Sequence, residues 1–206
     1  MQTHAAVSEY LELLDWRRRV SELFAELRRR PGGADTLAWF RSEKDELFRS
    51  HPQSPIPADE RASFTRLNYW PYDTSGRVEA RFQTEESEQT ERVPGEVPFR
   101  RVGSLAFHLH GRQATLAAFW IEGYAGGLFV PFRDATCGRE TYGGGRYLLD
   151  TIKSADFGSS ASDGTIVLDF NYAYHPSCTY DPRWVCPLAP PESRLPFPVP
   201  LGERLR

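Results

Sequence analysis

The hydrophobic period of this chain changes near Phe64, and this change constrains the fold more than any other feature. Before it, apolar residues recur three and four positions apart: Val7, Tyr10, Leu11 and Leu14, then Val20, Leu23, Phe24 and Leu27. After it, apolar and polar residues alternate, first over residues 77–83. The first pattern indicates amphipathic helix and the second half-solvated strand. The sequence therefore predicts a helical lead-in followed by a mainly β domain.

We expect two helices in the lead-in, arranged as a helical hairpin. The first spans the apolar positions up to Leu27 and stops at Pro31-Gly32-Gly33, where proline and glycine cannot continue it. Asp35 or Thr36 can cap the second helix, and His51-Pro52 ends it. The lead-in then covers residues 1–57 and packs on the β domain, residues 58–206, as one structural unit.

Six strands are expected in the β domain: residues 77–83, 100–110, 113–121, 126–132, 145–152 and 165–171. Gly111-Arg112 joins the second and third as a short hairpin. Short connections favour an antiparallel meander that closes, or nearly closes, into a β-barrel or roll. Gly143-Gly144-Gly145 precedes a strand rather than a helix, so a tight turn or bulge is favoured over a phosphate-binding loop.

The C-terminal stretch is rich in proline, because seven of the sixteen prolines lie between Pro182 and Pro200. Proline excludes a helix and a central strand there. The stretch nevertheless carries large apolar residues that a disordered tail would lack: Trp184, Val185, Leu188, Leu195, Phe197 and Val199. We therefore expect an ordered, extended strap that crosses the β domain.

Composition excludes several classes of protein. The net charge of −3 gives no basic excess, so no nucleic-acid partner is expected. Only Lys44 and Lys153 among the 25 basic residues are lysines, a skew that codon bias explains more simply than phosphate recognition. No apolar run approaches the ~20 residues of a membrane span, and residues 1–7 lack the pattern of a secretory signal. Three cysteines, an odd count, favour free thiols and a cytoplasmic location.

Long segments of the β domain resemble the signature segments of one protein family: residues 131–136, 140–148, 168–174 and 176–192. They are similar to the bacterial domain-of-unknown-function family numbered 1684. Lys44-Asp45, Ser54-Pro55 and Arg101-Val102-Gly103 are similar to it too. The chain departs from the pattern at His175 and Ser193, where asparagine is common, and at Pro200-Leu201-Gly202-Glu203, where a basic residue with Ala-Gly-Glu is usual. The resemblance implies kinship and brings no activity or cofactor with it.

Polar residues of two expected strands and their flanks form the candidate site. The residues considered for acid/base catalysis are Asp134, Glu140, Tyr142, Asp169 and His175. Two carboxylates can act as acid and base if burial separates their pKa values, and a histidine beside them can transfer protons. Thr136, Tyr147, Asn171 and Cys178 are the candidate ligand-binding residues. The alternative is a buried hydrogen-bond network that only anchors the strap.

The expected position of Asp169 and Asn171 carries most of this argument. In a strand over residues 165–171, both side chains share a face with Val167, whose apolar character indicates the interior. Antiparallel pairing with residues 145–152 would bring them near Asp134 and Tyr142. His175 would then lie at the rim of the barrel.

No metal site is expected. His108 and His110 share one strand face, but no carboxylate follows them and solvent exposure is the simpler reading. Cys178 and Cys186 lie too far apart for a zinc motif with Cys pairs two to four residues apart. We expect them to be small buried side chains within the strap, close enough to pair if oxidised.

Two functions remain open at this point. The leading hypothesis is a small-molecule-binding β-barrel, with metal-independent acid/base catalysis as an extension; whether the chain is an enzyme stays open. The alternative is a non-catalytic interaction or structural module, with the strap and helices forming a homodimer or partner surface. Motifs of the common hydrolases, NTPases and dinucleotide enzymes are absent from the sequence. The cofactor, if any, remains unknown.

Overall fold

The structure is a computed structural model that describes residues 2–85, 90–91, 97–124 and 126–205. The chain divides into two compact units, Met1–Arg66 and Leu67–Arg206. We refer to them as the helical unit and the β unit, and describe each by itself.

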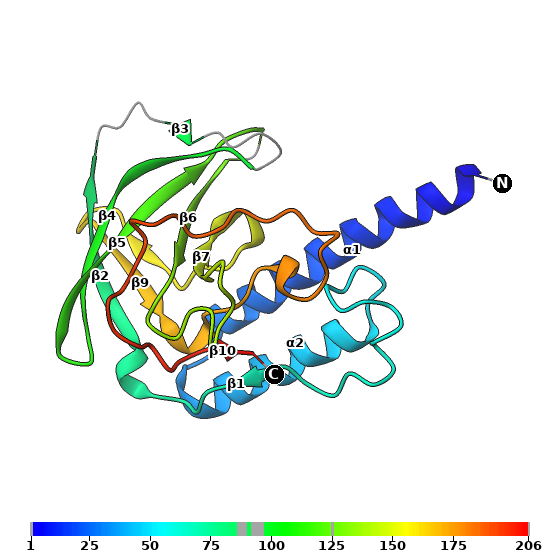
Figure 1. The fold of residues 1–206 in the computed structure, drawn as a ribbon, viewed down its shortest axis with the longest axis horizontal. Helices are drawn as coiled ribbons and strands as arrows, with labels where there is room; N and C mark the ends of the chain where they lie inside the picture. The colour runs from blue at the N-terminus through cyan, green and yellow to red at the C-terminus, as the bar shows by residue number, and fades with distance from the viewer. Residues whose placement is uncertain (1, 86–89, 92–96, 125, 206) are drawn as a thin grey trace. The chain divides into compact units, whose positions relative to one another are not determined.

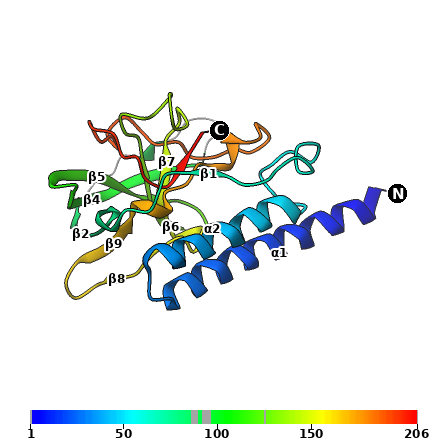
Figure 2. The same ribbon diagram turned by 90° about the horizontal axis from the view of Figure 1, so that it is seen from below.

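Two helices form the helical unit, as the apolar period predicts. α1 (Gln2–Arg29) and α2 (Gly33–Ser50) lie side by side and antiparallel (Figure 2). Their contact includes the rings of Phe24 and Phe40, whose centroids are 5.3 Å apart. Within the described part of the chain, neither helix is both long and apolar enough to cross a membrane.

The start of α2 differs from the expectation. Gly32 is the capping residue and no side chain caps the helix, so the predicted cap at Asp35 or Thr36 is wrong. Gly32 and Gly33 both have positive φ, 80° and 88°, which lets the chain turn directly into the helix three residues before the position that an Asp35 cap predicts. His51 ends α2 as predicted.

The two apolar stretches of α1 have different environments. Phe24 and Leu27 are buried, and Val20 and Leu23 are half-buried. The first stretch is exposed: its four apolar side chains keep between 57% and 72% of their surface in solvent, at Val7, Tyr10, Leu11 and Leu14.

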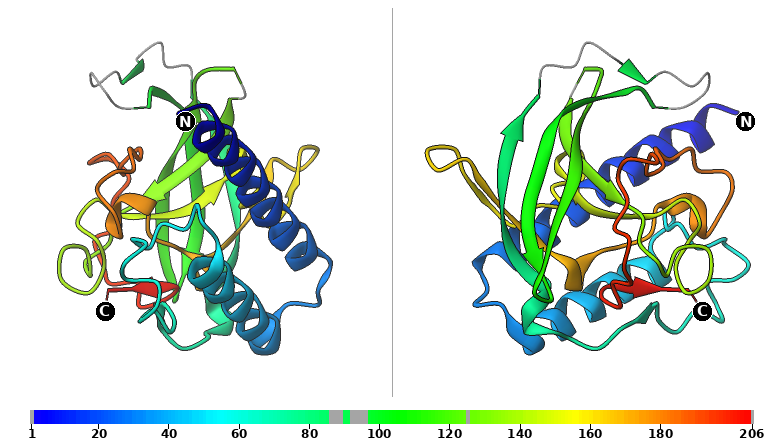
Figure 3. Two further views of the ribbon diagram at one scale, coloured as in Figure 1. Left: turned by 90° about the vertical axis from the view of Figure 1, so that its right-hand side faces the viewer. Right: turned by 60° about the vertical axis from the view of Figure 1, so that its left-hand side comes forward.

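The β unit is built on one antiparallel sheet that curls into a half-barrel (Figures 1 and 3). Its strands, in the order β7-β6-β5-β4-β2-β9-β8, are β7 (Arg146–Asp150), β6 (Gly127–Phe132), β5 (Arg112–Ile121), β4 (Phe99–Leu109), β2 (Arg77–Thr84), β9 (Thr165–Asp169) and β8 (Ser159–Ser160). β3 (Thr90–Glu91) pairs with β4. β1 (Asn68–Tyr69) pairs with β10 (Glu203–Arg204) in a separate two-stranded sheet. The predicted mainly β fold with an antiparallel sheet is confirmed.

Among the described residues, four 3₁₀ helices lie between the strands: η1 (Thr74–Gly76), η2 (Thr151–Lys153), η3 (Phe170–Tyr172) and η4 (Ser177–Thr179). η2 and η3 begin where the sequence predicted that strands continue. β9 therefore ends at Asp169, and Asn171 lies in η3. The core-facing side chains of β9 are Ile166 and Leu168, while Val167 is only half-buried. Val167 lies outside the core cluster, contrary to the prediction, whereas Asp169 and Asn171 of the same predicted face are buried, as expected.

The hairpin between β4 and β5 is displaced by one residue from its expected position. Leu109 pairs with Arg112, so the two-residue turn is His110-Gly111, and both residues have positive φ, 51° and 73°. Paired positive φ values produce the twist that such a hairpin needs. His110 thus leaves the strand and its Nε2 lies 3.1 Å from Asp73 Oδ2. His108 is exposed, as expected.

The proline-rich C-terminal segment contributes to the core without forming a continuous strand. Over residues 193–201 burial alternates strictly, and the buried positions are Ser193, Leu195, Phe197, Val199 and Leu201. The four apolar side chains among them join a cluster with sheet residues such as Leu105, Leu116 and Phe132. Figure 1 shows the segment, in red, crossing the half-barrel. One face of the sheet is therefore packed by the chain itself.

Replacement of Phe24 tests the helical unit. Phe24→Ala should lower the free energy of unfolding by about 3 kcal/mol, because it removes the ring that packs on Phe40. Leu14→Ala, on the exposed stretch of the same helix, should change it by no more than about 0.5 kcal/mol. Urea unfolding followed by circular dichroism measures both. Equal losses in the two variants would contradict the described packing of α1.

Candidate functional site

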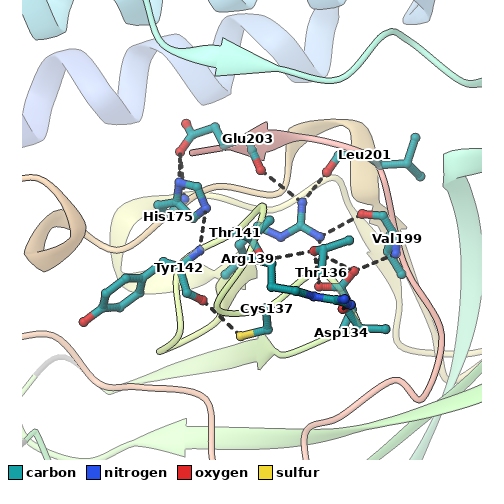
Figure 4. Close-up of polar contacts among 12 residues, drawn as sticks. Asp134, Thr136, Cys137, Arg139, Thr141, Tyr142, His175, Val199, Leu201 and Glu203 are labelled. Carbon is teal, nitrogen blue, oxygen red and sulfur yellow. Dashed lines mark hydrogen bonds and ion pairs between the residues drawn. The ribbon is translucent and has the colours of Figure 1, made fainter. Parts of the chain in front are cut away.

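The connection between β6 and β7 is held by hydrogen bonds among its own residues. Thr136 Oγ1 lies 2.8 Å from Asp134 Oδ1 and 3.0 Å from Thr141 Oγ1. The Thr136 carbonyl also accepts the backbone N–H groups of Arg139, Glu140 and Thr141 at 2.9–3.2 Å. Asp134, Thr136 and Thr141 are all buried (Figure 4). This is the local turn chemistry that Asp and Thr favour, and it makes the connection a fixed scaffold.

Asp134 also forms a buried ion pair with Arg146, the first residue of β7. Arg146 Nη2 lies 3.5 Å from Asp134 Oδ1, and both side chains are only 1% exposed. The guanidinium contacts the rings of Trp70 and Phe132, at 5.2 and 4.9 Å from their centroids. Burial lowers the pKa of Arg146 to about 10, against the opposing effects of Asp134 and Glu203, so the side chain remains a cation at neutral pH.

The same ion pair binds the backbone of the C-terminal segment. Arg146 donates to the carbonyls of Val199, at 2.9 Å, of Glu203, at 3.2 Å, and of Leu201. Asp134 Oδ2 accepts the backbone N–H of Val199 at 2.6 Å. We call Asp134, Arg146 and these three backbone partners the Arg146 latch. It connects β7 to the backbone of residues 199–203.

The glycine run at residues 143–145 forms a tight turn, as predicted. Gly145 has a φ of 93°, and a Cβ there would lie 2.6 Å from the Phe132 carbonyl oxygen. A Cβ on Gly144 would lie 2.4 Å from the ring of Tyr142. Gly144 and Gly145 are therefore glycine because the backbone approaches the Tyr142 ring and β6 too closely for any side chain, whereas a Cβ on Gly143 would meet open space.

His175 is buried between Tyr142 and Glu203 (Figure 4). A bridge between Tyr147 and Tyr174 places it beside the start of β7. Its Nε2 accepts the backbone N–H of Tyr142 at 3.3 Å, and its Nδ1 lies 3.7 Å from Glu203 Oε2. Because Nε2 acts as an acceptor, the ring positions Tyr142 in this arrangement.

Glu203 forms hydrogen bonds with His175 and with Tyr180. Its Oε2 accepts the backbone N–H of His175 at 2.8 Å and the hydroxyl of Tyr180 at 2.9 Å. Glu203 also belongs to β10, so the two-stranded sheet with β1 positions its side chain. The carboxylate is 1% exposed.

Asp169 and Asn171 form a different cluster. Asp169 Oδ1 accepts the backbone N–H and the Nδ2 of Asn171 at 3.1 and 2.9 Å. Asn171 Nδ2 donates to the Asp73 carbonyl at 2.8 Å, and its Oδ1 accepts the Asp73 N–H at 3.0 Å. Arg77 Nη1 lies 3.5 Å from Asp169 Oδ2. These contacts join η3 to the start of β2.

The expected pairing between β9 and β7 is therefore wrong. β9 pairs with β2 and β8, and its neighbours direct Asp169 toward Asp73 and Arg77 rather than Asp134. Burial raises the pKa of Asp169, while hydrogen bonds from Asn171 and the charge of Arg77 act in the opposite direction. The polar contacts of Asp169 and Asn171 are thus with each other and with Asp73 and Arg77.

Half-buried reactive groups gather where the proline-rich segment passes Tyr142. Cys178 Sγ lies 3.9 Å from the Tyr142 hydroxyl, and Cys186 is near enough to affect the pKa of Cys178. We call these three residues the thiol cluster. Burial, and then Cys186, raises the pKa of Cys178 to about 11. Burial, and then Cys178, raises the pKa of Tyr142.

All three cysteines are free thiols in the structure, and each is half-buried. The prediction that Cys178 and Cys186 are buried is wrong. Two buried atoms of the same segment, Thr179 Oγ1 and Trp184 Nε1, find no hydrogen-bond partner in the part of the chain that the structure describes. Among those residues no group of three or more His, Cys, Asp or Glu side chains is placed to hold a metal ion.

The candidate residues from the sequence thus separate into three places. Asp134 and Thr136 belong to the fixed connection, and Tyr142, His175 and Cys178 lie around the thiol cluster. Asp169 and Asn171 form the third group, near Asp73 and Arg77. Glu140 is exposed, so it does not form a carboxylate pair with buried Asp134. Tyr147 is fully buried and its hydroxyl donates to the Pro187 carbonyl at 2.5 Å, which leaves no surface for a ligand.

Sequence reasoning missed Arg146 and Glu203. Arg146 had a detectable signal, because it opens a run of buried apolar residues, Tyr147-Leu148-Leu149, in which a cation requires a partner. Glu203 had none, since its neighbours in space come from segments far apart in the sequence.

Removal of one partner of the Arg146 latch should destabilise the β unit. Asp134→Ala leaves the Arg146 cation buried without its carboxylate, and should lower the free energy of unfolding by about 3–5 kcal/mol. Glu140→Ala, in the same connection but exposed, should change it by no more than about 0.5 kcal/mol. Denaturant unfolding followed by tryptophan fluorescence compares them. A loss under about 1 kcal/mol for Asp134→Ala would show that the latch is not a principal anchor.

Asp169→Asn should reveal the raised pKa of Asp169 through a change in the pH dependence of thermal stability. A carboxyl whose pKa is higher folded than unfolded reduces stability as pH rises and the group ionises. The variant should therefore unfold at an equal or higher temperature than the wild type at about pH 7, and this advantage should shrink as pH falls toward about 4.

Asp73→Asn is the matched control for that measurement. The hydrogen bonds from Ser75 lower the pKa of Asp73, with a further contribution from His110, so its ionised form stabilises the fold at neutral pH. Asp73→Asn should therefore unfold at a lower temperature than the wild type at about pH 7, a change opposite in sign to that of Asp169→Asn. A pH-independent difference for Asp169→Asn would contradict the raised pKa.

Comparisons with known proteins agree with this architecture. The family model described as "Protein of unknown function (DUF1684)" matches residues 62–204. A solution NMR structure of an uncharacterized protein from Haloarcula marismortui is 37% identical, covers 83% of this chain and 93% of its own, and has a TM-score of 0.61. No curated protein matches the chain. Because the family model covers well over half of the sequence, this chain belongs to the DUF1684 family.

Proposed function

We propose that this protein binds a small thiophilic ligand at the thiol cluster, and that it does so without acid/base catalysis. One observation carries the proposal: the half-buried Cys178 thiol lies 3.9 Å from the half-buried Tyr142 hydroxyl, and the half-buried Cys186 acts on the pKa of both groups. Neighbouring thiols that solvent reaches are the groups to which soft electrophiles and soft metal ions bind.

The surroundings of the cluster favour a prepared binding site. Tyr142 is positioned by His175 through its backbone and by the close approach of Gly144 to its ring. The connection that carries Tyr142 is fixed at its base by the Arg146 latch. Side chains held by such a supporting layer lose little freedom when a ligand binds.

Two buried polar atoms between the two cysteines in the sequence support the same proposal. Thr179 Oγ1 and Trp184 Nε1 belong to the segment between Cys178 and Cys186 and have no hydrogen-bond partner among the described residues. Buried polar atoms in proteins are almost always satisfied. A ligand on the thiol cluster, with its bound water, would offer them acceptors.

The contacts of the remaining candidate residues argue against acid/base catalysis. Asp134 is buried and engaged by Arg146, Thr136 and Val199, so a substrate does not reach it. His175 Nε2 is occupied by the Tyr142 backbone. With a pKa of about 11, Cys178 is a thiol rather than a thiolate at neutral pH, which makes it a poor nucleophile.

The packing of the sheet also argues against a ligand inside the barrel. Leu195, Phe197, Val199 and Leu201 pack against the side chains of one face of the sheet. A small molecule on that face would have to displace the chain's own core. The surface around the thiol cluster is therefore the better candidate.

Phenylarsine oxide tests this proposal, because it bridges two neighbouring thiols with release of one water molecule. The folded wild type should take up one equivalent, detected by native mass spectrometry. Cys137→Ser should do the same, because Cys137 donates to the carbonyls of Tyr142 and Gly143 and stands outside the cluster.

Cys178→Ser and Cys186→Ser should not form the adduct, although circular dichroism should show wild-type folding for both. If the wild type takes up no reagent, or if Cys137→Ser also loses the adduct, the thiol cluster is not a dithiol site and the proposal fails.

A further inference from the structure

The first turns of α1 extend past the end of the helix on which α1 packs. α1 has 28 residues and α2 has 18, so at about 1.5 Å per residue α1 is about 15 Å longer. The C-terminal end of α2 meets α1 at Trp16, whose ring centroid lies 5.8 Å from that of Phe48 and 5.2 Å from that of His51. The turns before Trp16 therefore continue without α2 beside them (Figure 2).

Two different sides of α1 carry apolar residues. Trp16, Val20 and Phe24, spaced three and four apart, follow the side that packs on α2. The same spacing recurs on another side in four side chains that keep 57–72% of their surface exposed: Val7, Tyr10, Leu11 and Leu14. We call these four residues the α1 stripe. Contiguous exposed apolar surface of this kind marks an interaction site.

Basic residues continue the α1 stripe on the same side of the helix. Arg17 and Arg18 stand three and four positions after Leu14. Arg18 forms an ion pair with Asp15 of its own helix. Arg17 is exposed and forms no ion pair within the part of the chain that the structure describes. The side therefore begins apolar and ends with a cation that lacks an opposite charge.

A reversed copy of the same helix complements this pattern. When two α1 helices lie antiparallel with Leu11 of each opposite Leu14 of the other, Tyr10 of one copy lies beside Arg17 of the other. A guanidinium over the face of a tyrosine ring gains a cation–π interaction. The Leu11–Leu14 contact and the Tyr10–Arg17 contact each form twice. Both the apolar pattern and the charge thus favour a second copy over an unrelated apolar surface.

We infer that the α1 stripe is the interface of a homodimer, in which the two α1 helices pack antiparallel. Each contact is repeated by a two-fold axis, so the assembly closes at two chains, as in the commonest class of homo-oligomer. The interface lies in the helical unit and is independent of the thiol cluster, which belongs to the β unit. It goes beyond the proposed binding function.

The size of the α1 stripe suits a weak dimer. Its four side chains leave roughly 500 Å² of mostly apolar surface per chain in water. Two copies therefore bury about 1,000 Å² in total, near the lower limit for a specific interface. We expect a Kd of about 10–100 µM, so the protein is mostly monomeric near 1 µM and mostly dimeric near 300 µM. The Leu14→Ala unfolding comparison, made at about 1 µM, then reports on the monomer.

Sedimentation velocity of the full-length protein between about 1 and 300 µM tests the interface. The wild-type sedimentation coefficient should rise with concentration from the monomer value to the dimer value. Leu11→Lys and Leu14→Glu each place a charge in the apolar contact, and should raise the Kd at least about 30-fold. Val185→Glu is the matched control, because Val185 is similarly exposed (67%) but lies in the β unit. It should dimerise as the wild type does.

An equimolar mixture of the two charged variants tests the antiparallel arrangement. In the mixed dimer, the lysine introduced at position 11 of one chain faces the glutamate introduced at position 14 of the other, and the second Leu11–Leu14 contact stays intact. The mixture should therefore dimerise with a Kd within about 10-fold of the wild-type value. Parallel helices would bring identical positions together, and the mixture would then remain monomeric.

Several results would overturn the inference. They are a wild type that stays monomeric near 300 µM, charged variants that dimerise like the wild type, a control variant that does not dimerise, and a mixture that stays monomeric. A monomeric wild type that binds phosphatidylglycerol vesicles, with binding lost in Leu14→Glu, would assign the α1 stripe to a lipid surface instead. Circular dichroism of each variant excludes unfolding as the cause of a lost dimer.

Discussion

A buried cation needs an opposite charge and hydrogen-bond acceptors, and in this protein Arg146 obtains both from segments that would otherwise be unconnected. Its carboxylate partner comes from the connection before β7, and its carbonyl partners come from the end of the chain. A buried charge left unpaired is among the costliest defects that a fold can contain. The position of the C-terminal segment over the sheet, and of β10 beside β1, is consistent with that one requirement.

The support of the thiol cluster follows from the same arrangement. The segment that ends at Glu203 brings a carboxylate to His175, and His175 holds the backbone of Tyr142. The polar network of Glu203 and His175 is thus largely hydrogen-bonded and buried. The side chains of the thiol cluster, in contrast, are half-buried and reactive. The residues that anchor the fold are therefore different from those proposed to bind a ligand. Both kinds nevertheless occur within the same short stretches of sequence.

Local pattern was sufficient to predict much of the fold. The helices, the long β4–β5 hairpin and the turn at Gly143-Gly144-Gly145 each depend on periodicity or on backbone freedom that neighbouring residues determine. The candidate site was predicted only in part, because its contacts are non-local. Asp169 was assigned to the wrong cluster since a short 3₁₀ helix ended β9 two residues early and since β9 pairs with β2. Alternation within one strand carries no information about either event.

The alternating prolines of the C-terminal segment have a consequence for how this protein behaves in a crowded solution. Pro196, Pro198 and Pro200 occupy exposed positions and have no N–H to donate, while the N–H groups of Leu195, Val199 and Leu201 are bound within the protein. An extended segment on a protein surface normally offers a row of donors to which another chain can add as a strand. Here few backbone N–H donors are free, so this segment resists intermolecular strand addition and the aggregation that begins with it.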